Sequence, residues 1–201
     1  MRHKLNEIQW CPGCWDFLIL MAVRNAFKHL DIPSKDRVVV TGIGCSWKIS
    51  QYIDGYAAET LHGRAIPFAT GVKLANSKLT VVVIGWDGDG YGIGLGHFLH
   101  ACRRNLDLVY IVCNNENYGL TTGQASPTTP LWAKTKTTPT GSTLAPFDPQ
   151  ELAKHAGAWF TERAKSSDFK WLTALIERAI EHPWFAHIDV LQDCPSFRKW
   201  Q

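Results

Sequence analysis

Three short apolar runs constrain the fold of this chain more than any other feature. They are RVVVTG at residues 37–42, LTVVVIG at 79–85 and LDLVYIVCNN at 106–115, and each is rich in β-branched residues. Continuous runs of this kind favour strands that are buried on both faces of a parallel sheet. Helix-like segments at 63–76 and 94–105 separate the runs. Strands that alternate with helices predict an α/β fold, a parallel sheet with helices on both faces.

The remaining segments extend this pattern. Residues 16–30 carry apolar side chains at helical spacing, which predicts a helix before the first strand. From 120 to 149 the chain is rich in Thr, Pro and Gly, which predicts a long loop, and loops of this length in compact domains tend to be functional. After it, 148–157 and 168–182 have the pattern of helices, and 185–192 has that of a last strand.

Length and composition limit the class of protein. The 201 residues suit one domain, 1–201, with its own core, and a hydrophobic content of 45% favours a globular chain. The net charge is only +3 without a basic run, so we expect no nucleic-acid partner. No apolar segment approaches the roughly 20 residues that cross a bilayer, and the start MRHKLNEIQW lacks a signal-peptide core. We therefore expect a cytoplasmic protein without a membrane partner, whose cysteines are thiols or metal ligands rather than disulfides.

Polar residues follow two of the predicted strands. The sequence DGDG at 87–90 comes after the second run, and Asn114-Asn115 closes the third. In open parallel sheets ligands bind beyond the carboxyl ends of the strands. Carboxylate and amide oxygens suit Mg²⁺, and the glycines would let backbone N–H groups approach a diphosphate. A tight glycine turn with a capping aspartate and no ligand explains this loop alone equally well.

Four of the six cysteines form a second group. Cys11 and Cys14 make a C-x-x-C, Cys45 follows the first run, and Cys194 follows the last predicted strand. Four thiolates can hold an iron–sulfur cluster or a structural zinc, and this spacing alone does not choose between them. The other two cysteines lie within a helix pattern and a strand pattern, which favours buried inert thiols: Cys102 and Cys113.

Taken together, these segments resemble the β subunit of 2-oxoacid:ferredoxin oxidoreductases, which bind thiamine diphosphate. The motifs that carry the resemblance are WCPGC, GIGCS, LHGRA, DGD followed by GIG, HACRRN, NNENYGLTTGQASPTTP and DVLQDCPSF. They extend from Trp10 to about Phe197, nearly the whole chain. The resemblance implies the diphosphate-binding half of a thiamine diphosphate-binding fold.

The resemblance also implies roles for individual residues. The implied ligands of a [4Fe–4S] cluster are Cys11, Cys14, Cys45 and Cys194. The implied Mg²⁺ ligands are Asp87, Asn115 and the backbone carbonyl of Asn117. The positions implied to line the cofactor are Gly44, Ser46, His62, Gly63, Gly88, Asp89, Gly119 and Leu120. Lys48 would meet the carboxylate of the substrate, where a mobile point charge is useful.

The implied activity is oxidative decarboxylation of a 2-oxoacid. Coenzyme A would take the acyl group, and electrons would pass through the cluster to ferredoxin. Family β subunits lack the pyrimidine-binding domain that supplies an activating glutamate, so the resemblance implies a hetero-oligomer with an α-type subunit and an inactive single chain. Thr122 places a neutral side chain near the expected substrate end, which faintly favours pyruvate or another uncharged acid. The alternatives are a non-catalytic iron–sulfur electron carrier and a zinc-stabilised α/β protein without cofactor binding.

Tryptophans depart from the family pattern. The chain has nine, and Trp15, Trp47 and Trp86 stand where the pattern has glycine, with Trp184 a weaker case. An indole there would obstruct the cofactor, and it would strain the backbone wherever the glycine had a positive φ. Either the site has diverged, or UGA codons that the gene reads as glycine were written as tryptophan; the shared direction of the changes favours the second. Family chains often continue beyond the CPSF segment, so the oligomeric state is not predicted.

Overall fold

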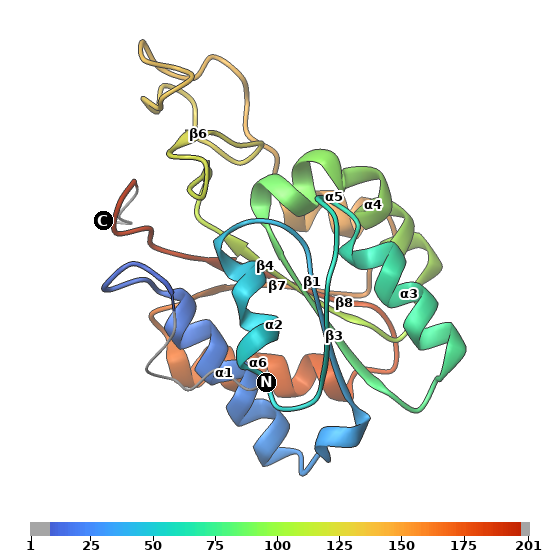
Figure 1. The fold of residues 1–201 in the computed structure, drawn as a ribbon. Helices are drawn as coiled ribbons and strands as arrows, with labels where there is room; N and C mark the ends of the chain where they lie inside the picture. The colour runs from blue at the N-terminus through green and yellow to red at the C-terminus, as the bar shows by residue number, and fades with distance from the viewer. Residues whose placement is uncertain (1–8, 198–201) are drawn as a thin grey trace.

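A six-stranded parallel sheet forms the centre of the molecule, in the order β2-β1-β3-β4-β8-β7 (Figure 1). The computed structural model describes residues 9–197. The strands of this sheet are β1 (Arg37–Thr41), β2 (Tyr56–Glu59), β3 (Thr80–Trp86), β4 (Val109–Asn114), β7 (Phe160–Lys165) and β8 (Ala186–Leu191). A separate antiparallel pair consists of β5 (Asn117–Tyr118) and β6 (Gln124–Ala125).

Helices cover both faces of the sheet, as the sequence predicts (Figure 1). One layer contains α1 (Asp16–His29), α2 (Ile49–Tyr52) and α6 (Phe169–Glu181). The other layer contains α3 (Ala65–Ala75), α4 (Leu95–Arg104) and α5 (Pro149–His155). Short helical turns are η2 (Ser34–Asp36), η3 (Cys45–Lys48) and the π-helical η4 (Gly88–Ile93). No helix within the described residues is long and apolar enough to span a membrane.

Strand β3 explains why a continuous apolar run suits this sheet. Val82 and Ile84 point into the core beneath α1 and α6, while Val81 and Val83 point into the core beneath α3 and α4. Successive side chains of a strand alternate between faces, so a strand that is covered on both faces needs apolar residues at every position. The continuous run at 79–85 is therefore the expected sequence for a central strand.

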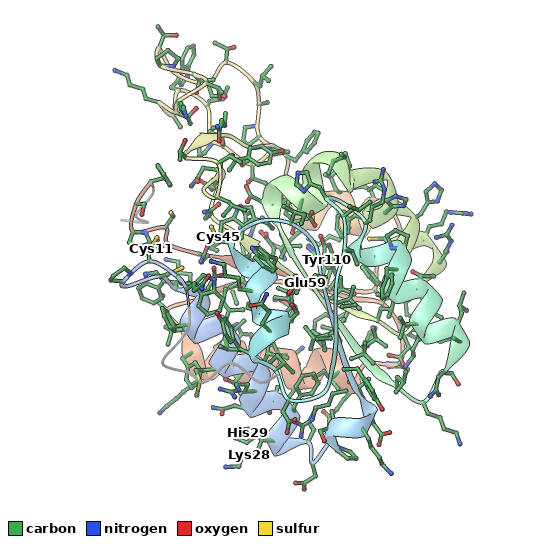
Figure 2. The ribbon with its side chains drawn as sticks, in the orientation of Figure 1. Cys11, Lys28, His29, Cys45, Glu59 and Tyr110 are labelled. Carbon is green, nitrogen blue, oxygen red and sulfur yellow. The ribbon has the colours of Figure 1, made fainter. Side chains whose placement is uncertain are left out.

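The carboxyl ends of β1, β3, β4 and β8 lie at one edge of the sheet, which we call the carboxyl edge. Because these strands are parallel neighbours, the loops that follow them meet there. Figure 2 shows Cys11 and Cys45 toward this end of the molecule, and Lys28 and His29 of α1 at the opposite end. The predicted long loop is confirmed as an arm, residues 120–147, that extends away from the body (Figure 1).

Two edge strands were not predicted. β2 is mostly exposed, and β7 has the sequence FTERAK with only one buried residue. An edge strand is covered less than a central one, so it carries polar residues and gives no apolar run. The helices predicted at 16–30, 63–76 and 94–105 are confirmed as α1, α3 and α4.

Candidate cofactor site at the carboxyl edge

Asp87 directly follows β3 and is fully buried. Its Oδ2 accepts a hydrogen bond from Thr128 Oγ1 at 2.8 Å, while its Oδ1 has no hydrogen-bond partner within residues 9–197. Burial raises the pKa of Asp87 to about 7, because the carboxylate loses its hydration there. A cation at the free oxygen would compensate for that loss, so Asp87 is chemically suited to bind one.

The turn at residues 115–119 lies beside Asp87, because β3 and β4 pair with Trp86 opposite Cys113. The Asn117 N–H donates to Oδ1 of Asn115 at 3.2 Å, and Glu116 between them has a φ of 58°. Nδ2 of Asn115 and Oδ1 of Asn117 are buried without a hydrogen-bond partner among the described residues. A Cβ at Gly119 would lie 3.3 Å and 3.2 Å from these two atoms, so a glycine lets the turn close over them.

Asp89 has a different position from Asp87, although both belong to the DGD sequence. Its Oδ1 accepts hydrogen bonds from the backbone N–H groups of Ile43 at 2.9 Å and Gly63 at 2.7 Å, and lies 2.8 Å from Nδ1 of His62. Asp89 therefore ties together the loops after β1, β2 and β3. A Cβ at Gly42 would lie 2.0 Å from Asp89 Oδ2, so a glycine is required there by close packing.

The four predicted cluster cysteines line one pocket of about 220 Å³, which we call the cysteine pocket. They are Cys11, Cys14, Cys45 and Cys194. The same pocket is lined by Lys48, Trp86, Gly119 and Leu120. The pocket thus joins the thiols to residues implied to line the cofactor. Within residues 9–197, no three Cys, His, Asp or Glu side chains approach closely enough to hold one metal ion.

The thiols have few polar neighbours in the pocket. Cys14 donates to Oδ2 of the buried Asp16 at 3.6 Å, and Gln192 Nε2 lies 3.8 Å from the Cys14 sulfur. Burial raises the pKa of Cys14 well above its usual value and that of Cys45 to about 12. A thiol in such surroundings stays protonated at neutral pH, and a bound metal centre is what would favour the thiolate.

Two further predicted residues lie next to the pocket. Lys48 donates from Nζ to the Gln9 carbonyl at 2.6 Å, so its ammonium group is at the pocket mouth. Ser46 is buried and donates to the carbonyl of Gly85 at 3.4 Å. Gly44 has a φ of 143°, a conformation that favours glycine. The structure therefore gathers the predicted residues of the 44–48 segment near the cysteines.

The suspected tryptophans do not strain the backbone. Trp15, Trp47 and Trp86 are absent from the described residues with positive φ, so the condition under which strain was expected is not met at these positions. Trp132 in the arm, which the sequence did not single out, has a φ of 66°. Trp86 is only 3% exposed, and its Nε1 donates to the backbone carbonyl of Asn117 at 2.9 Å. The indole therefore engages one of the implied Mg²⁺ ligands.

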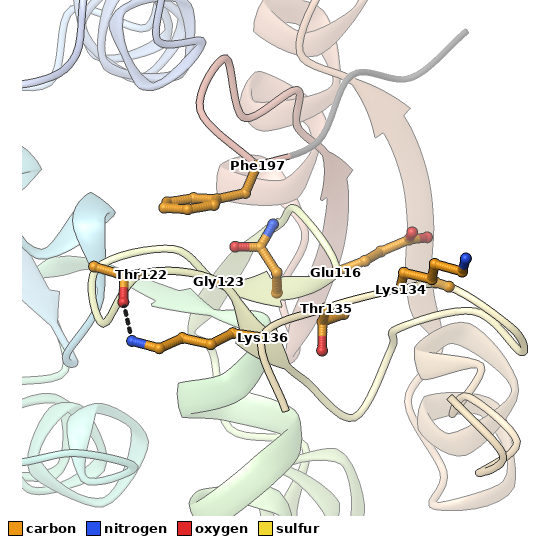
Figure 3. Close-up of a pocket in the computed structure, with 9 residues that line it drawn as sticks. Glu116, Thr122, Gly123, Lys134, Thr135, Lys136 and Phe197 are labelled. Atoms are coloured by element: carbon orange, nitrogen blue, oxygen red, sulfur yellow. Dashed lines mark hydrogen bonds between the residues drawn. The ribbon is translucent and has the colours of Figure 1, made fainter. Parts of the chain in front are cut away.

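A second pocket of about 230 Å³ lies between the 115–119 turn and the arm (Figure 3). Its lining includes Glu116, Lys134 and Lys136, together with Phe197 from the segment after β8. Lys136 donates from Nζ to Thr122 Oγ1 at 2.7 Å, as the dashed line in Figure 3 marks. The Thr122 side chain is therefore neutral, but the ammonium group of Lys136 places a positive charge beside it.

A buried polar network supports the site from the side of β8. Asp189 accepts hydrogen bonds from Asn114 Nδ2 at 3.0 Å, Tyr91 at 3.1 Å and Arg163 Nε at 2.8 Å. Thr128 Oγ1 lies 2.8 Å from both Asp87 Oδ2 and Asn114 Oδ1, so it links this network to Asp87. Sequence reasoning missed Thr128 and Asp189. The available signals were that Thr128 lies within the motif NNENYGLTTGQASPTTP in the long loop, and that Asp189 begins the motif DVLQDCPSF.

Known proteins similar to this chain identify its family. Residues 42–190 match the thiamine pyrophosphate enzyme, C-terminal TPP binding domain. The chain is 50% identical over 196 residues to a 2-oxoacid:ferredoxin oxidoreductase subunit beta of Saccharolobus solfataricus, covering 96% of this chain and 64% of that one. It is 45% identical over 199 residues to the 2-oxoglutarate synthase subunit KorB of Archaeoglobus fulgidus, covering 99% of this chain and 74% of that one.

Solved structures agree with these relatives. A 2-oxoglutarate:ferredoxin oxidoreductase from Magnetococcus marinus superposes with a TM-score of 0.95 at 40% identity, covering 98% of this chain and 67% of that one. A Rhodococcus jostii thiamine diphosphate-dependent decarboxylase, at 16% identity and a TM-score of 0.62, shares the fold alone. The predicted fold class is confirmed. The chain belongs to the thiamine pyrophosphate-binding domain family and, within it, to the β subunits of 2-oxoacid:ferredoxin oxidoreductases.

Proposed function

We propose that this chain is the cofactor-binding subunit of an enzyme that oxidatively decarboxylates a 2-oxoacid in the cytoplasm and passes the electrons to ferredoxin. One observation carries the proposal. Four cysteines line a pocket that also contains Trp86 and Gly119; Trp86 directly precedes Asp87 and donates to the Asn117 carbonyl, and Gly119 ends the 115–119 turn. Electron transfer between a diphosphate cofactor and a cluster requires the two groups to lie close together, as a thiol-lined pocket next to a buried oxygen-rich turn would allow.

The oxygen-rich turn fits a magnesium–diphosphate group by donor type. Asp87 and Asn115 would hold Mg²⁺, with the Asn117 carbonyl as a further ligand. One observation supports this assignment: Oδ1 of Asp87, the charged member of the set, is buried without a hydrogen-bond partner in the described residues. Mg²⁺ prefers such oxygens and shares its remaining positions with phosphate. A bound cation would keep Asp87 ionised at neutral pH.

The cysteine pocket fits a cluster by its four thiols, the ligand set of a [4Fe–4S] centre. A four-iron cluster is much larger than a single ion, so its thiolates surround a cavity instead of converging on one point. Cys11, Cys14, Cys45 and Cys194 would hold it. Thiamine diphosphate, when bound, would supply the electron sink for decarboxylation, and a cluster would supply one-electron acceptance.

The other residues of this chain would bind and orient. Asp89 holds three loops in place through its hydrogen bonds to Ile43, Gly63 and His62, so it fixes the glycine-rich backbone around the cofactor. Lys48 would release Gln9 and meet the carboxylate of the substrate at the pocket mouth. The described residues contain no second α/β domain, so an α-type partner would supply the activating glutamate, and coenzyme A and ferredoxin would be the other reactants.

Lys136 favours a 2-oxoacid with a second negative group. Its ammonium nitrogen lies on Thr122, at the end of the site where the distal part of the substrate is expected. A cation there would stabilise a distal carboxylate, as in 2-oxoglutarate, by a charge-assisted hydrogen bond. This observation works against the sequence-based preference for pyruvate, which rested on the neutral side chain of Thr122.

The test is anaerobic reconstitution with iron and sulfide, with and without the α-type partner. We expect a brown protein that is bleached by a reductant, inactive alone, and able to reduce ferredoxin in the complex when 2-oxoacid, coenzyme A, thiamine diphosphate and Mg²⁺ are present. A colourless protein that holds zinc would support the structural-zinc alternative. A brown protein without cofactor affinity, alone or in the complex, would support the electron-carrier alternative.

A further inference from the structure

Trp86 lies between the cysteine pocket and the 115–119 turn. It lines the pocket, and its Nε1 donates to the Asn117 carbonyl at 2.9 Å. The side chain is 3% exposed and belongs to the core cluster beneath α1 and α6. The indole is therefore a packed wall with one polar contact, made to an implied Mg²⁺ ligand.

The indole is also wedged between two loops implied to line the cofactor. A Cβ at Gly44 would lie 2.8 Å from the Trp86 Cβ, and a Cβ at Gly119 would lie 3.8 Å from the Trp86 ring. Glycine is used at such positions so that a ligand can approach the backbone. Here an indole occupies that approach on both sides.

The hydrogen bond from Trp86 to the Asn117 carbonyl places the indole N–H where it would repel a bound cation. The N–H edge of an indole carries partial positive charge, so it repels a cation that approaches the same oxygen. Mg²⁺ demands nearly octahedral geometry and tolerates a displaced ligand poorly. To bind at Asn117, the ion would have to share the carbonyl with this N–H at close range, or break the buried hydrogen bond and displace a packed ring.

We infer that Trp86 and the magnesium–diphosphate group compete for the Asn117 carbonyl, so that tight binding of the cofactor by this subunit requires a small residue at position 86. This inference rests on the proposed function, because it concerns the same cofactor. Trp15 and Trp47 have no such contact: neither lines the cysteine pocket.

The experiment is calorimetric titration of the full chain with thiamine diphosphate, with and without Mg²⁺, alone and in complex with the α-type partner. Three variants are compared with the unchanged chain. Trp86→Gly removes the ring, Trp86→Phe removes only the N–H donor while keeping a buried ring, and Trp132→Gly changes a tryptophan that is 72% exposed in the arm and lines neither pocket.

We expect Trp86→Gly to lower the Mg²⁺-dependent Kd by at least about tenfold, the effect of one buried hydrogen bond that no longer has to be broken. Trp86→Phe is expected to give a smaller decrease, and Trp132→Gly none. Because Trp86→Gly leaves a cavity, thermal unfolding establishes that each variant is folded; if Trp86→Gly is not, the decrease in Trp86→Phe carries the test.

The contrary outcomes are separable. If the unchanged chain binds as tightly as Trp86→Gly, or if folded Trp86→Phe gains nothing where Trp86→Gly cannot be measured, the competition is refuted while the proposed function stands. If no folded variant binds thiamine diphosphate in either setting, both the competition and the cofactor part of the proposed function are refuted.

Discussion

Two buried polar regions meet at Thr128, and they differ in how completely their hydrogen bonds are made. On the β8 side, every side-chain oxygen and nitrogen of Asn114, Asp189 and His187 has a partner. On the β3 side, Asp87 Oδ1, Asn115 Nδ2 and Asn117 Oδ1 have none among the described residues. Buried polar groups in folded proteins are nearly always paired.

The difference distinguishes a region that stabilises the fold, on the β8 side, from a region suited to bind a ligand, on the β3 side. A complete network rigidifies the structure and stabilises it, because each member would be costly to leave alone. An incomplete one destabilises the chain until a ligand completes it. Substitutions in the network around Asp189 should therefore lower the free energy of unfolding. Substitutions in the Asp87 region should instead lower cofactor binding and activity.

Asp87→Asn should have the largest effect. It keeps the shape of the side chain and the hydrogen bond from Thr128 but removes the charge that would hold the cation. We expect the activity of the reconstituted complex to fall by about 10²–10³-fold or more, with the free energy of unfolding of the metal-free chain changed by less than about 1 kcal/mol. Ferredoxin reduction and urea unfolding measure the two effects. A large loss of stability with activity retained would reverse the roles of the two regions.

Asp189→Asn is the matched change in the complete network. Its carboxylate accepts from Tyr91, Asn114 and Arg163, and an amide cannot accept from all three without turning a donor toward one of them. We expect the free energy of unfolding to fall by about 3 kcal/mol. Urea unfolding of this variant beside Asp87→Asn compares the two regions directly, and equal stability of the two variants would contradict the distinction.

His187 predicts how the complete network responds to pH. The ring is fully buried between Tyr91 and Thr161, and burial lowers its pKa from 6.5 to about 3. Below pH 6.5 the unfolded chain binds a proton that the folded chain does not, so stability falls as the pH drops from 6.5 toward 3. At pH 5 this loss should amount to about 2 kcal/mol. Urea unfolding from pH 7 to 4 should show a shallower slope for His187→Gln, and an unchanged slope would mean that the ring does not titrate as described.

The strands that hold both regions could be predicted from the sequence, because they depend on local residue patterns. Strands β3 and β4 are continuous apolar runs; DGD directly follows β3 and NN closes β4, so parallel pairing alone brings Asp87 toward Asn115. The four cysteines also line one pocket. The ligand roles themselves remain predictions, since they depend on groups that the amino-acid pattern only implies.

The sequence did not predict contacts that depend on the path of the arm. Thr128 reaches Asp87 across 41 residues, and Lys136 reaches Thr122 only because the arm folds back on itself. Thr128 lies within a quoted motif, but nothing in that motif marks its contact with Asp87, and Lys136 does not stand out among the lysines of the segment. The direction of the Trp86 ring likewise depends on its hydrogen bond to the Asn117 carbonyl, which its place at the end of β3 does not predict.

Lys136→Met tests the part of the site that borders the arm, where the distal end of the substrate is expected. Removing the ammonium group should raise KM for 2-oxoglutarate about tenfold and leave KM for pyruvate nearly unchanged, since only the former has a distal carboxylate. Steady-state kinetics of the complex with both acids gives the result. Lys134→Met, a nearby lysine of the same pocket without the contact to Thr122, is the control. Equal effects of Lys136→Met on both acids would indicate general electrostatics and not recognition.

Trp132→Gly should have the smallest effect. It tests backbone strain in the arm and changes neither of the two buried polar regions. Trp132 has a φ of 66°, a left-handed conformation that costs a bulky residue about 1–2 kcal/mol and glycine almost nothing. The ring is largely exposed, so little packing is lost. We expect thermal unfolding to show a gain of about 1 kcal/mol, with cofactor binding unchanged. The codons at 86 and 132 offer an independent check: UGA at both, in a gene that reads UGA as glycine, would explain the blocked carbonyl and the strained backbone by one cause, whereas UGG at both would make them properties of the protein itself.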